Sequence, residues 1–241
     1  MSEPAIRRAV VLAAGRGTRM GEITVDLPKA MLPVRGRPML EHVLDGLARA
    51  GIREFFLVVG YRRESIESHF RAWRSGHIEF CVQETLNGTA AAARLARGFV
   101  GQEPFLLTFG DILCQPAAYL NCAQIIQDHP QTVAVLGVRD VDDPWQGAAV
   151  YDVAGRVTQV IEKPPRGTST TRWNSAGLYA MRPPVFDYLD RVTPSVRNEY
   201  ELTSIFEMML ADGLELRISP IEGHWRDVGR PEDLEAVNSA E

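Results

Sequence analysis

The feature that most constrains the fold is an unbroken apolar run near the N-terminus that ends in a glycine-rich loop. Residues 9–14 read Ala-Val-Val-Leu-Ala-Ala, and Gly15-Arg16-Gly17-Thr18-Arg19 follows directly. An apolar run without polar alternation is typical of a strand buried on both faces of a parallel or mixed sheet. Glycines let backbone N–H groups turn toward an anion, and Arg19 adds charged donors. The pattern predicts an α/β fold whose first strand leads into a phosphate-binding loop, although a plain tight turn has the same pattern.

The segments after this loop alternate between helix and strand patterns. Apolar residues recur at helical spacing over 39–48, and Gly51 follows as a stop signal. The remaining segments of this half, in order, are a strand at 55–59, a helix that contains Ile66, Phe70 and Trp73, a strand at 78–83, a helix from Thr89 and a strand at 105–109. Such alternation is typical of a parallel or mixed α/β sheet.

The second half has a different rhythm of closely spaced strand candidates. They lie at 132–138, 148–151, 157–161 and 177–181, with a turn at Ala154-Gly155. Helices return at 185–190 and 202–212, followed by a strand at 216–221 and a helix after Pro231. We find no linker or repeat, so we predict one domain over 1–241, with one lobe at about 1–130 and an antiparallel lobe at about 131–241.

Composition excludes several classes of protein. With 45% apolar and 24% charged residues and no long apolar run, the chain is typical of a soluble globular protein without a membrane segment. Residues 1–8 leave no room for a signal-peptide core, so we expect a cytoplasmic protein. The net charge of −5 without a Lys/Arg block argues against nucleic-acid binding. Cys81, Cys114 and Cys122 form no CxxC pair and are expected to be buried apolar residues.

Two common nucleotide-binding motifs are absent from the loop. No Gly-Lys-Ser/Thr follows the glycines, which excludes a Walker loop, and Met20 replaces the third glycine of the dinucleotide fingerprint. The second strand candidate ends in Gly60 without an acidic residue for a ribose. An NAD-dependent dehydrogenase is therefore disfavoured.

A specific resemblance appears when the loop is read together with a downstream lysine. Leu12-Ala13-Ala14-Gly15-Arg16-Gly17-Thr18-Arg19-Met20 followed by Pro28-Lys29 resembles the signature of the sugar-1-phosphate nucleotidyltransferases, also called nucleoside-diphosphate-sugar pyrophosphorylases. The resemblance implies a Rossmann-like three-layer sandwich with a central mixed, mostly parallel sheet and a small antiparallel sugar-binding lobe. It also implies that the loop binds the triphosphate, that Arg19 neutralises the β- and γ-phosphates, and that Lys29 contacts the α-phosphate. The loop residues given this nucleotide-binding role are Leu12, Ala13, Ala14, Gly15, Gly17 and Thr18.

Gln83-x4-Gly88-Thr89-Ala90 is similar to the segment that recognises the base in this family. The resemblance implies that the Gln83 amide hydrogen-bonds a pyrimidine edge, with Gly88 and Thr89 close to the nucleotide. UTP or dTTP is the favoured donor, although a similar segment occurs in relatives that use guanosine, adenosine or cytidine triphosphates. An ordinary polar residue at a strand end is the alternative interpretation of Gln83.

Two aspartates lie 116 positions apart, in Phe109-Gly110-Asp111 and Trp225-Arg226-Asp227-Val228-Gly229. Asp111 follows a predicted buried strand, where ligands bind in open α/β sheets, although a turn-capping aspartate is the simpler interpretation. The second segment matches the family pattern Trp-x-Asp-x-Gly. The resemblance implies that Asp111 and Asp227 hold a catalytic Mg²⁺, an ion that two carboxylates, water and phosphate suit well.

Between the aspartates lie Gly147, Glu162-Lys163-Pro164 and Asn174-x-x-Gly177-x-Tyr179, which are similar to the family's sugar pocket. The resemblance implies that Gly147 and Glu162 meet sugar hydroxyls, that Lys163 meets the sugar phosphate and that Asn174 lies near the sugar. A solvated Glu-Lys pair at a strand end is the common alternative.

The implied reaction is attack by the phosphate of a sugar 1-phosphate on the α-phosphorus of the triphosphate. Both substrates are small molecules, and assembly into a homo-oligomer is compatible with the sequence. Alternatives are a cytidylyl- or guanylyltransferase that acts on another phosphorylated sugar or phospho-alcohol, and a non-catalytic nucleotide-sugar sensor, which we would expect to lack the charged residues. Because the sequence stops soon after the helix that follows Asp227, we expect no left-handed β-helix domain.

Overall fold

The computed structural model describes residues 6–239; residues 1–5, which carry part of the signal-peptide argument, and residues 240–241 lie outside the described residues. The strands are β1 (Arg8–Leu12), β2 (Pro33–Val34), β3 (Arg37–Pro38), β4 (Glu54–Val59), β5 (His77–Val82), β6 (Phe105–Phe109), β7 (Ile112–Cys114), β8 (Thr132–Asp140), β9 (Ala148–Val153), β10 (Arg156–Glu162), β11 (Trp173–Met181), β12 (Glu215–Pro220) and β13 (Trp225–Asp227). The α-helices are α1 (Met39–Arg49), α2 (Arg63–Phe70), α3 (Thr89–Arg94), α4 (Arg97–Val100), α5 (Pro116–Asp128), α6 (Val185–Leu189), α7 (Ser204–Ala211) and α8 (Pro231–Ser239), and the 3₁₀ helices are η1 (Thr18–Thr24) and η2 (Lys29–Met31).

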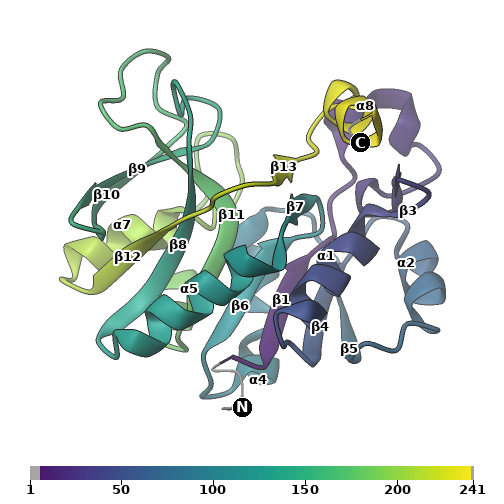
Figure 1. Ribbon diagram of the computed structural model, residues 1–241, viewed down its shortest axis with the longest axis horizontal. Coiled ribbons are helices and arrows are strands. Elements are labelled where there is room, and N and C mark those ends of the chain that lie inside the picture. Colours follow the sequence, from purple (N-terminus) through teal and green to yellow (C-terminus); the bar gives the residue numbers. More distant parts are fainter. Residues whose placement is uncertain (1–5, 240–241) are drawn as a thin grey trace.

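A nine-stranded mixed sheet runs through the molecule in the order β5-β4-β1-β6-β11-β8-β12-β10-β9 (Figure 1). The first four strands in this order are parallel, with Ala9 of β1 opposite Phe55 of β4 and Leu106 of β6. This half of the sheet confirms the predicted strand-helix alternation.

The other half of the sheet is mainly antiparallel, as expected for the second half of the chain, so the prediction that the sheet as a whole is mostly parallel is wrong. The pairs β6–β11, β11–β8, β12–β10 and β10–β9 are antiparallel, and β8–β12 alone is parallel there. The β9–β10 pair is antiparallel because a tight hairpin joins the two strands, without a crossover helix. The hairpin turns at the predicted Ala154-Gly155, where both residues have positive φ, 52° and 81°.

The antiparallel strands are continuous with the parallel half of the sheet. β11 lies between β6 and β8, so a single sheet continues from the first half of the chain into the second (Figure 1). The apolar character of both strands explains this position, since β8 is buried from Thr132 to Val138 and the second half of β11 is also buried. Strands that are buried on both faces lie in the middle of a sheet, where helices cover both faces.

Helices cover both faces of the sheet. Side chains alternate along β1, so that Ala9 and Val11 join the core beneath α1 and α5, whereas Val10 and Leu12 join the core beneath α3, α6 and α7. The strand is therefore buried on both faces, as its unbroken apolar run predicts. No helix within residues 6–239 combines the length and apolar character needed to cross a membrane.

The carboxyl ends of β1, β4 and β6 lie side by side and place three loops at one edge of the sheet. Leu12 O accepts a hydrogen bond from Gly110 N at 3.0 Å, and Tyr61 N donates to Ala14 O at 3.0 Å. A small ribbon of β7 and β13, absent from the prediction, brings Asp227 opposite Ile112. Residues from the start, middle and end of the chain therefore meet at this edge.

The expected burial of the three cysteines is confirmed only for Cys122. Cys122 is buried, Cys81 and Cys114 are half-buried, and all are free thiols. Burial raises the pKa of Cys114 to about 11 and that of Cys122 to about 12. Both thiols therefore stay protonated and unreactive near neutral pH.

Candidate active site

The glycine loop packs directly on Lys29. Gly17 adopts a left-handed conformation with φ of 75°, and a Cβ at this position would lie 2.7 Å from Lys29 Cβ. Only glycine meets both conditions without strain. Met20, which is 1% exposed, donates from its N–H to Gly17 O at 2.9 Å and anchors the start of η1 in the core. The loop and Lys29 thus form one structural unit.

Lys29 lies between the two predicted metal-binding aspartates. Its Nζ donates a hydrogen bond to Asp111 Oδ2 and lies 3.9 Å from Asp227 Oδ1. Pro28 and the short η2 helix fix the backbone at Lys29, and Asp111 follows the buried strand β6. Val228 N donates to Asp111 O at 3.1 Å, which ties the two aspartate segments together. The structure therefore brings Asp111 and Asp227 around one cationic group.

The pKa of Asp227 is raised from its usual 3.8 to about 6. Loss of solvation by the surrounding protein is the largest cause, and repulsion by the Asp111 carboxylate is the second. Lys29 and then Arg19 act in the opposite direction and lower this pKa. Half of the Asp227 side-chain surface, 51%, remains open to solvent, so the carboxylate is crowded and still accessible.

Arg19 extends from η1 toward the same edge. Its Nη1 would lie 3.9 Å from a Cβ at Gly229, two residues after Asp227. Asp233 accepts hydrogen bonds from the backbone N–H groups of Gly229 and Arg230, at 3.0 and 2.8 Å, and so fixes this turn. Arg19, Lys29 and the aspartate pair therefore occupy one charged cluster.

The predicted base-recognition residues surround a second part of the same edge. Gln83 is 8% exposed and donates from Nε2 to Gly88 O at 3.1 Å. Gln83 also lines a surface pocket of about 300 Å³ together with Gly60, Tyr61, Arg62, Arg63, Glu64, Val82, Glu84 and Leu86. Gly88 has φ of 127°, and a Cβ there would lie 2.4 Å from Tyr200 O. The loop from Gln83 to Gly88 is thus held in one conformation.

Thr89 has a contact that its predicted nucleotide-binding role did not include. Its Oγ1 accepts a hydrogen bond from the backbone N–H of Leu202 at 2.9 Å. The hydroxyl therefore holds a segment of the second half of the chain.

The four predicted sugar-pocket residues lie together at the end of β10 and directly after it, on β11, and in the loop before β9. A Cβ at Gly147 would lie 2.4 Å from Asn174 Oδ1, and Lys163 N donates to Gly147 O at 2.7 Å. Asn174 Oδ1 is buried and has no hydrogen-bond partner among residues 6–239. Lys163 Nζ lies 3.9 Å from Glu162 Oε1, and its side chain is 43% exposed.

Both oxygens of the Glu162 carboxylate have protein partners. Thr203 Oγ1 donates to Oε2 at 2.9 Å, and Arg197 Nη2 donates to Oε1 at 3.3 Å. Burial raises the pKa of Glu162, while the hydrogen bond from Thr203 lowers it.

Strand β11 links the sugar-pocket residues to the charged cluster. Asn174 lies near its beginning, and Trp225 Nε1 in β13 donates to Ala176 O at 3.0 Å. Thr108 Oγ1 in β6 donates to Gly177 O at 3.0 Å, at an irregularity in the register of β11.

Comparison with known proteins identifies the family of the chain. A family model for nucleotidyl transferases matches residues 8–241. The chain belongs to the nucleotidyl transferase family.

Two nucleotidyl transferases of Haloferax volcanii show how far the likeness extends. The chain is 33% identical over 235 residues to the low-salt glycan biosynthesis nucleotidyltransferase Agl11, a match that covers 96% of this chain and 65% of Agl11. It therefore spans less than two thirds of that relative. It is 33% identical over 234 residues to the UTP–glucose-1-phosphate uridylyltransferase AglF, which covers 94% of this chain and 93% of AglF.

A solved structure confirms the fold of this nucleotidyl transferase. The structure of UDP-glucose pyrophosphorylase complexed with UDP-glucose superposes with a TM-score of 0.86 at 21% identity, covering 97% of each chain.

Several residues that shape the candidate site were not predicted from the sequence. Arg197 and Thr203 contact Glu162, and Tyr200 packs against Gly88, yet all three lie outside the quoted motifs. Tyr61 was missed too, although the Arg16 guanidinium lies 5.3 Å from the centre of its ring. Their only signal in the sequence is a polar stretch between two helix patterns and an aromatic residue after Gly60.

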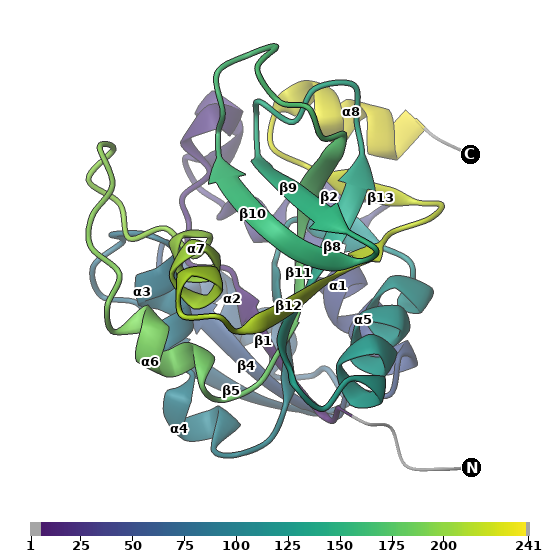
Figure 2. The ribbon, with the colours of Figure 1, turned by 90° about the vertical axis from the view of Figure 1, so that its left-hand side faces the viewer.

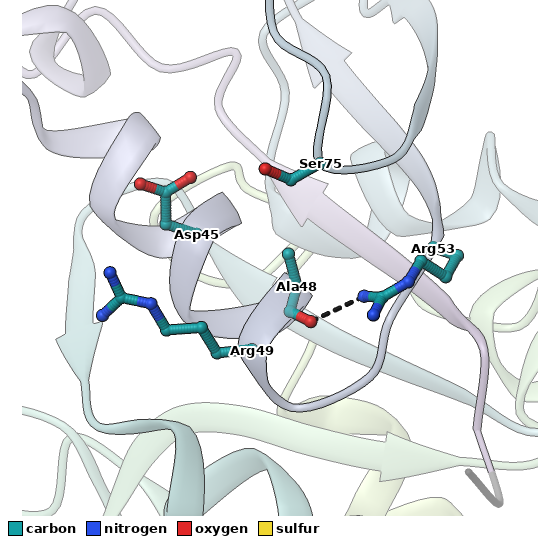
Figure 3. A pocket seen from close by; sticks show the side chains of 5 residues that line it. All are labelled: Asp45, Ala48, Arg49, Arg53 and Ser75. Carbon is teal, nitrogen blue, oxygen red and sulfur yellow. Dashed lines mark hydrogen bonds between the residues drawn. The ribbon is translucent and has the colours of Figure 1, made fainter. Parts of the chain in front are cut away.

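A cavity of about 410 Å³ lies away from this site, at the end of α1 (Figure 3). Asp45, Ala48, Arg49, Arg53 and Ser75 line it. Arg53 Nη1 donates to Ala48 O at 2.6 Å and Ile52 O at 2.7 Å, so this arginine satisfies carbonyl groups at a helix end. The cavity lies beside the amino end of β4, opposite the edge where α/β sheets bind ligands.

Proposed function

We propose that this nucleotidyl transferase moves a nucleotidyl group from a nucleoside triphosphate to a sugar 1-phosphate and releases pyrophosphate. The observation that carries the proposal is the contact of Lys29 with Asp111, Asp227 and the glycine loop. A lysine placed between a phosphate-binding loop and two carboxylates joins a triphosphate site to a candidate metal site. We place the reaction in the cytoplasm.

The positive charges suit a reaction between two anions. Arg19 and Lys29 lie at the charged cluster, and Lys163 follows β10 at the sugar pocket. At 4 Å and an effective dielectric constant of 20, each pair of opposite unit charges contributes about 4 kcal/mol. These side chains would offset the repulsion between the substrates and stabilise the added charge of the transition state.

The residues present fit a magnesium ion. Asp111 and Asp227 are close enough that one carboxylate raises the pKa of the other, an arrangement that a divalent cation relieves. Within residues 6–239 no group of three or more His, Cys, Asp or Glu side chains is arranged to hold a metal, so water and phosphate oxygens would complete the coordination. Mg²⁺ bound there would neutralise phosphate charge and polarise the α-phosphate.

The proposed transfer needs no protein nucleophile. The attacking phosphate of a sugar 1-phosphate has a second pKa near 6 and is largely dianionic at neutral pH. The role of the protein is therefore to hold the attacking oxygen in line with the departing pyrophosphate and to balance charge. Arg19 and Lys29 supply the charge on the triphosphate side, and Lys163 supplies it on the sugar-phosphate side.

The hydrogen bonding of Gln83 supports UTP or dTTP as the donor. Nε2 of Gln83 donates to Gly88 O, and Oε1 has no recorded partner among residues 6–239. This orientation leaves the carbonyl oxygen of the side chain as an acceptor for a base. It would accept the N3–H of uracil or thymine, whereas N3 of cytosine is itself an acceptor. The name of the relative AglF, a UTP–glucose-1-phosphate uridylyltransferase, agrees with this choice.

The retained charges favour catalysis over a sensor role. A non-catalytic sensor would not need the Lys29 bridge, and the crowded aspartate pair with a raised pKa has a cost in stability. The buried Asn174 Oδ1 and the Glu162 carboxylate provide acceptors suited to sugar hydroxyls. A sugar 1-phosphate is therefore favoured over a simple phospho-alcohol.

The donor is tested by a competition among triphosphates. The protein is incubated with Mg²⁺, glucose 1-phosphate and an equimolar mixture of UTP, dTTP, CTP, GTP and ATP, and the products are identified by mass spectrometry. We expect UDP-glucose or dTDP-glucose to dominate. A dominant CDP-, GDP- or ADP-sugar would contradict the role given to Gln83.

A further inference from the structure

The connection between α6 and α7 touches both substrate pockets. Residues 197–203 run beside α3 on one side and toward the end of β10 on the other (Figure 2). This segment is here called the connector, and residues 83–90 are called the base loop. Side-chain and backbone hydrogen bonds join the connector to the base loop and to Glu162.

On the nucleotide side, the connector is paired with the base loop as in a short strand pair. Tyr200 N donates to Asn87 O at 2.8 Å, and Ala90 N donates to Tyr200 O at 2.8 Å. Gly88 lies so close that a Cβ there would be 2.4 Å from Tyr200 O. Leu202 N, in a residue that is 2% exposed, donates to Thr89 Oγ1 at 2.9 Å. Three hydrogen bonds and one close backbone approach therefore join the two segments.

On the sugar side, the connector holds both oxygens of Glu162. Thr203 Oγ1 and Arg197 Nη2 donate to them at 2.9 and 3.3 Å. Glu201, which is 8% exposed, accepts from Arg197 Nε at 3.1 Å. A shift of the connector therefore changes the position of the Glu162 carboxylate.

We propose that Thr89 is a positioning residue that couples the base pocket to the sugar pocket through the connector. The Thr89 hydroxyl accepts a hydrogen bond from Leu202 N, and the next residue, Thr203, donates a hydrogen bond to Glu162. The inference rests on the proposed function, because it assigns the two pockets to the two substrates. Thr89 belongs by sequence to the nucleotide segment, and its hydroxyl sets the geometry of the sugar segment.

Thr89 is the best point to break this coupling. The other bonds between the base loop and the connector are between backbone groups, which substitution of a side chain does not remove. Thr89→Val keeps the shape of the side chain and removes the acceptor, which leaves the Leu202 N–H unpaired next to the core. Thr89→Ser keeps the acceptor. Thr85→Val is the matched control, because Thr85 lies in the same loop and its side chain makes no recorded hydrogen bond in the described structure.

Steady-state kinetics separate this role from direct nucleotide binding. We expect Thr89→Val to raise the KM for the sugar 1-phosphate about tenfold, the scale of a buried donor left unpaired. The KM for the triphosphate should change by less than about threefold, because the base contacts remain. Thr89→Ser should restore the sugar-phosphate KM. A Thr89→Val effect confined to the triphosphate KM would overturn the proposal.

Hydrogen exchange of the ligand-free protein tests the same coupling without any substrate. We expect Thr89→Val, but not Thr85→Val or Thr89→Ser, to speed amide exchange in residues 198–205 and also in residues 158–164, which contain Glu162. Faster exchange restricted to residues 84–92, or none, would refute the coupling. The hydrogen-exchange result does not depend on the formation of a nucleotide sugar. It therefore distinguishes failure of the inference from failure of the proposed function.

Discussion

Nζ of Lys29 donates a hydrogen bond to Oδ2 of Asp111, although the two residues lie 82 positions apart in the chain. One residue belongs to the segment after the glycine loop, and the other follows the buried strand β6. The bond exists because the carboxyl ends of β1 and β6 are paired in register, which places the loops that follow them side by side. The same contact joins the proposed triphosphate site to the proposed metal site.

We expect Asp111→Asn and Asp227→Asn each to lower turnover by about two orders of magnitude or more, because each removes a charge that would bind Mg²⁺. The fold should be retained, since both carboxylates lie at an open edge of the sheet. The measurement is the initial rate of product formation at saturating substrates. Asp142→Asn, at a side chain that is 99% exposed, is the control and should keep the wild-type rate. Near-wild-type turnover of either site variant would contradict the metal assignment.

The raised pKa of Asp227 gives Asp227→Asn a pH-dependent effect on stability. An acid whose pKa rises from 3.8 to about 6 on folding destabilises the folded state when ionised. This penalty is absent below pH 4 and complete above about pH 7. Because the side chain is half exposed, solvent screening limits the gain from Asn to about 1 kcal/mol, or roughly 2 to 4 °C in Tm.

We therefore expect metal-free Asp227→Asn to melt above the wild type at pH 7.5 and to match it at pH 4. Thermal unfolding followed by circular dichroism in the presence of EDTA measures both values. A variant that is less stable than the wild type at pH 7.5 would show that the carboxylate pair is not strained without a cation.

Gly88→Ala should destabilise the protein and impair nucleotide binding. The new Cβ would meet Tyr200 O at 2.4 Å in a backbone conformation with φ of 127°. We expect a loss of about 2 to 4 kcal/mol in the free energy of unfolding and a higher KM for the triphosphate. Gly98→Ala is the matched control, because a Cβ there meets nothing within 4 Å inside helix α4. Equal melting temperatures for the two variants would contradict the packing described for the base loop.

Lys163→Ala should mainly raise the KM for the sugar 1-phosphate. Lys163 follows β10, its backbone N–H is held by Gly147 O at 2.7 Å, and its side chain is 43% exposed. Removal of this charge should weaken an anionic ligand without disturbing the core. Initial rates with each substrate varied in turn measure the two KM values. A change confined to the triphosphate KM would argue against the placement of Lys163.

The sequence predicted the parallel half of the fold well because its signals there are local. Residues 9–14 form an unbroken apolar run, and Gly51 ends a helix with φ of 98°, so both element type and boundary could be inferred. The order of strands in the second half could not be inferred. The insertion of β11 between β6 and β8 depends on pairing between distant segments, which periodicity does not record.

Contacts between distant segments also limit what the sequence predicts about the candidate site. Arg19, Lys29, Asp111 and Asp227 were inferred from motifs, and the structure brings them together. Thr89 was assigned to the nucleotide, yet its hydrogen bond to Leu202 arises from contact between segments 113 positions apart. No local pattern reports such a contact.

Pyrophosphate release tests the central claim most directly. The purified protein is assayed with a panel of sugar 1-phosphates, each with UTP or dTTP, with Mg²⁺ or EDTA. We expect pyrophosphate to form only when triphosphate, sugar 1-phosphate and Mg²⁺ are all present, in a one-to-one ratio with the nucleotide sugar. Absence of pyrophosphate across the panel, together with tight binding of a nucleotide sugar, would contradict catalysis and identify a sensor.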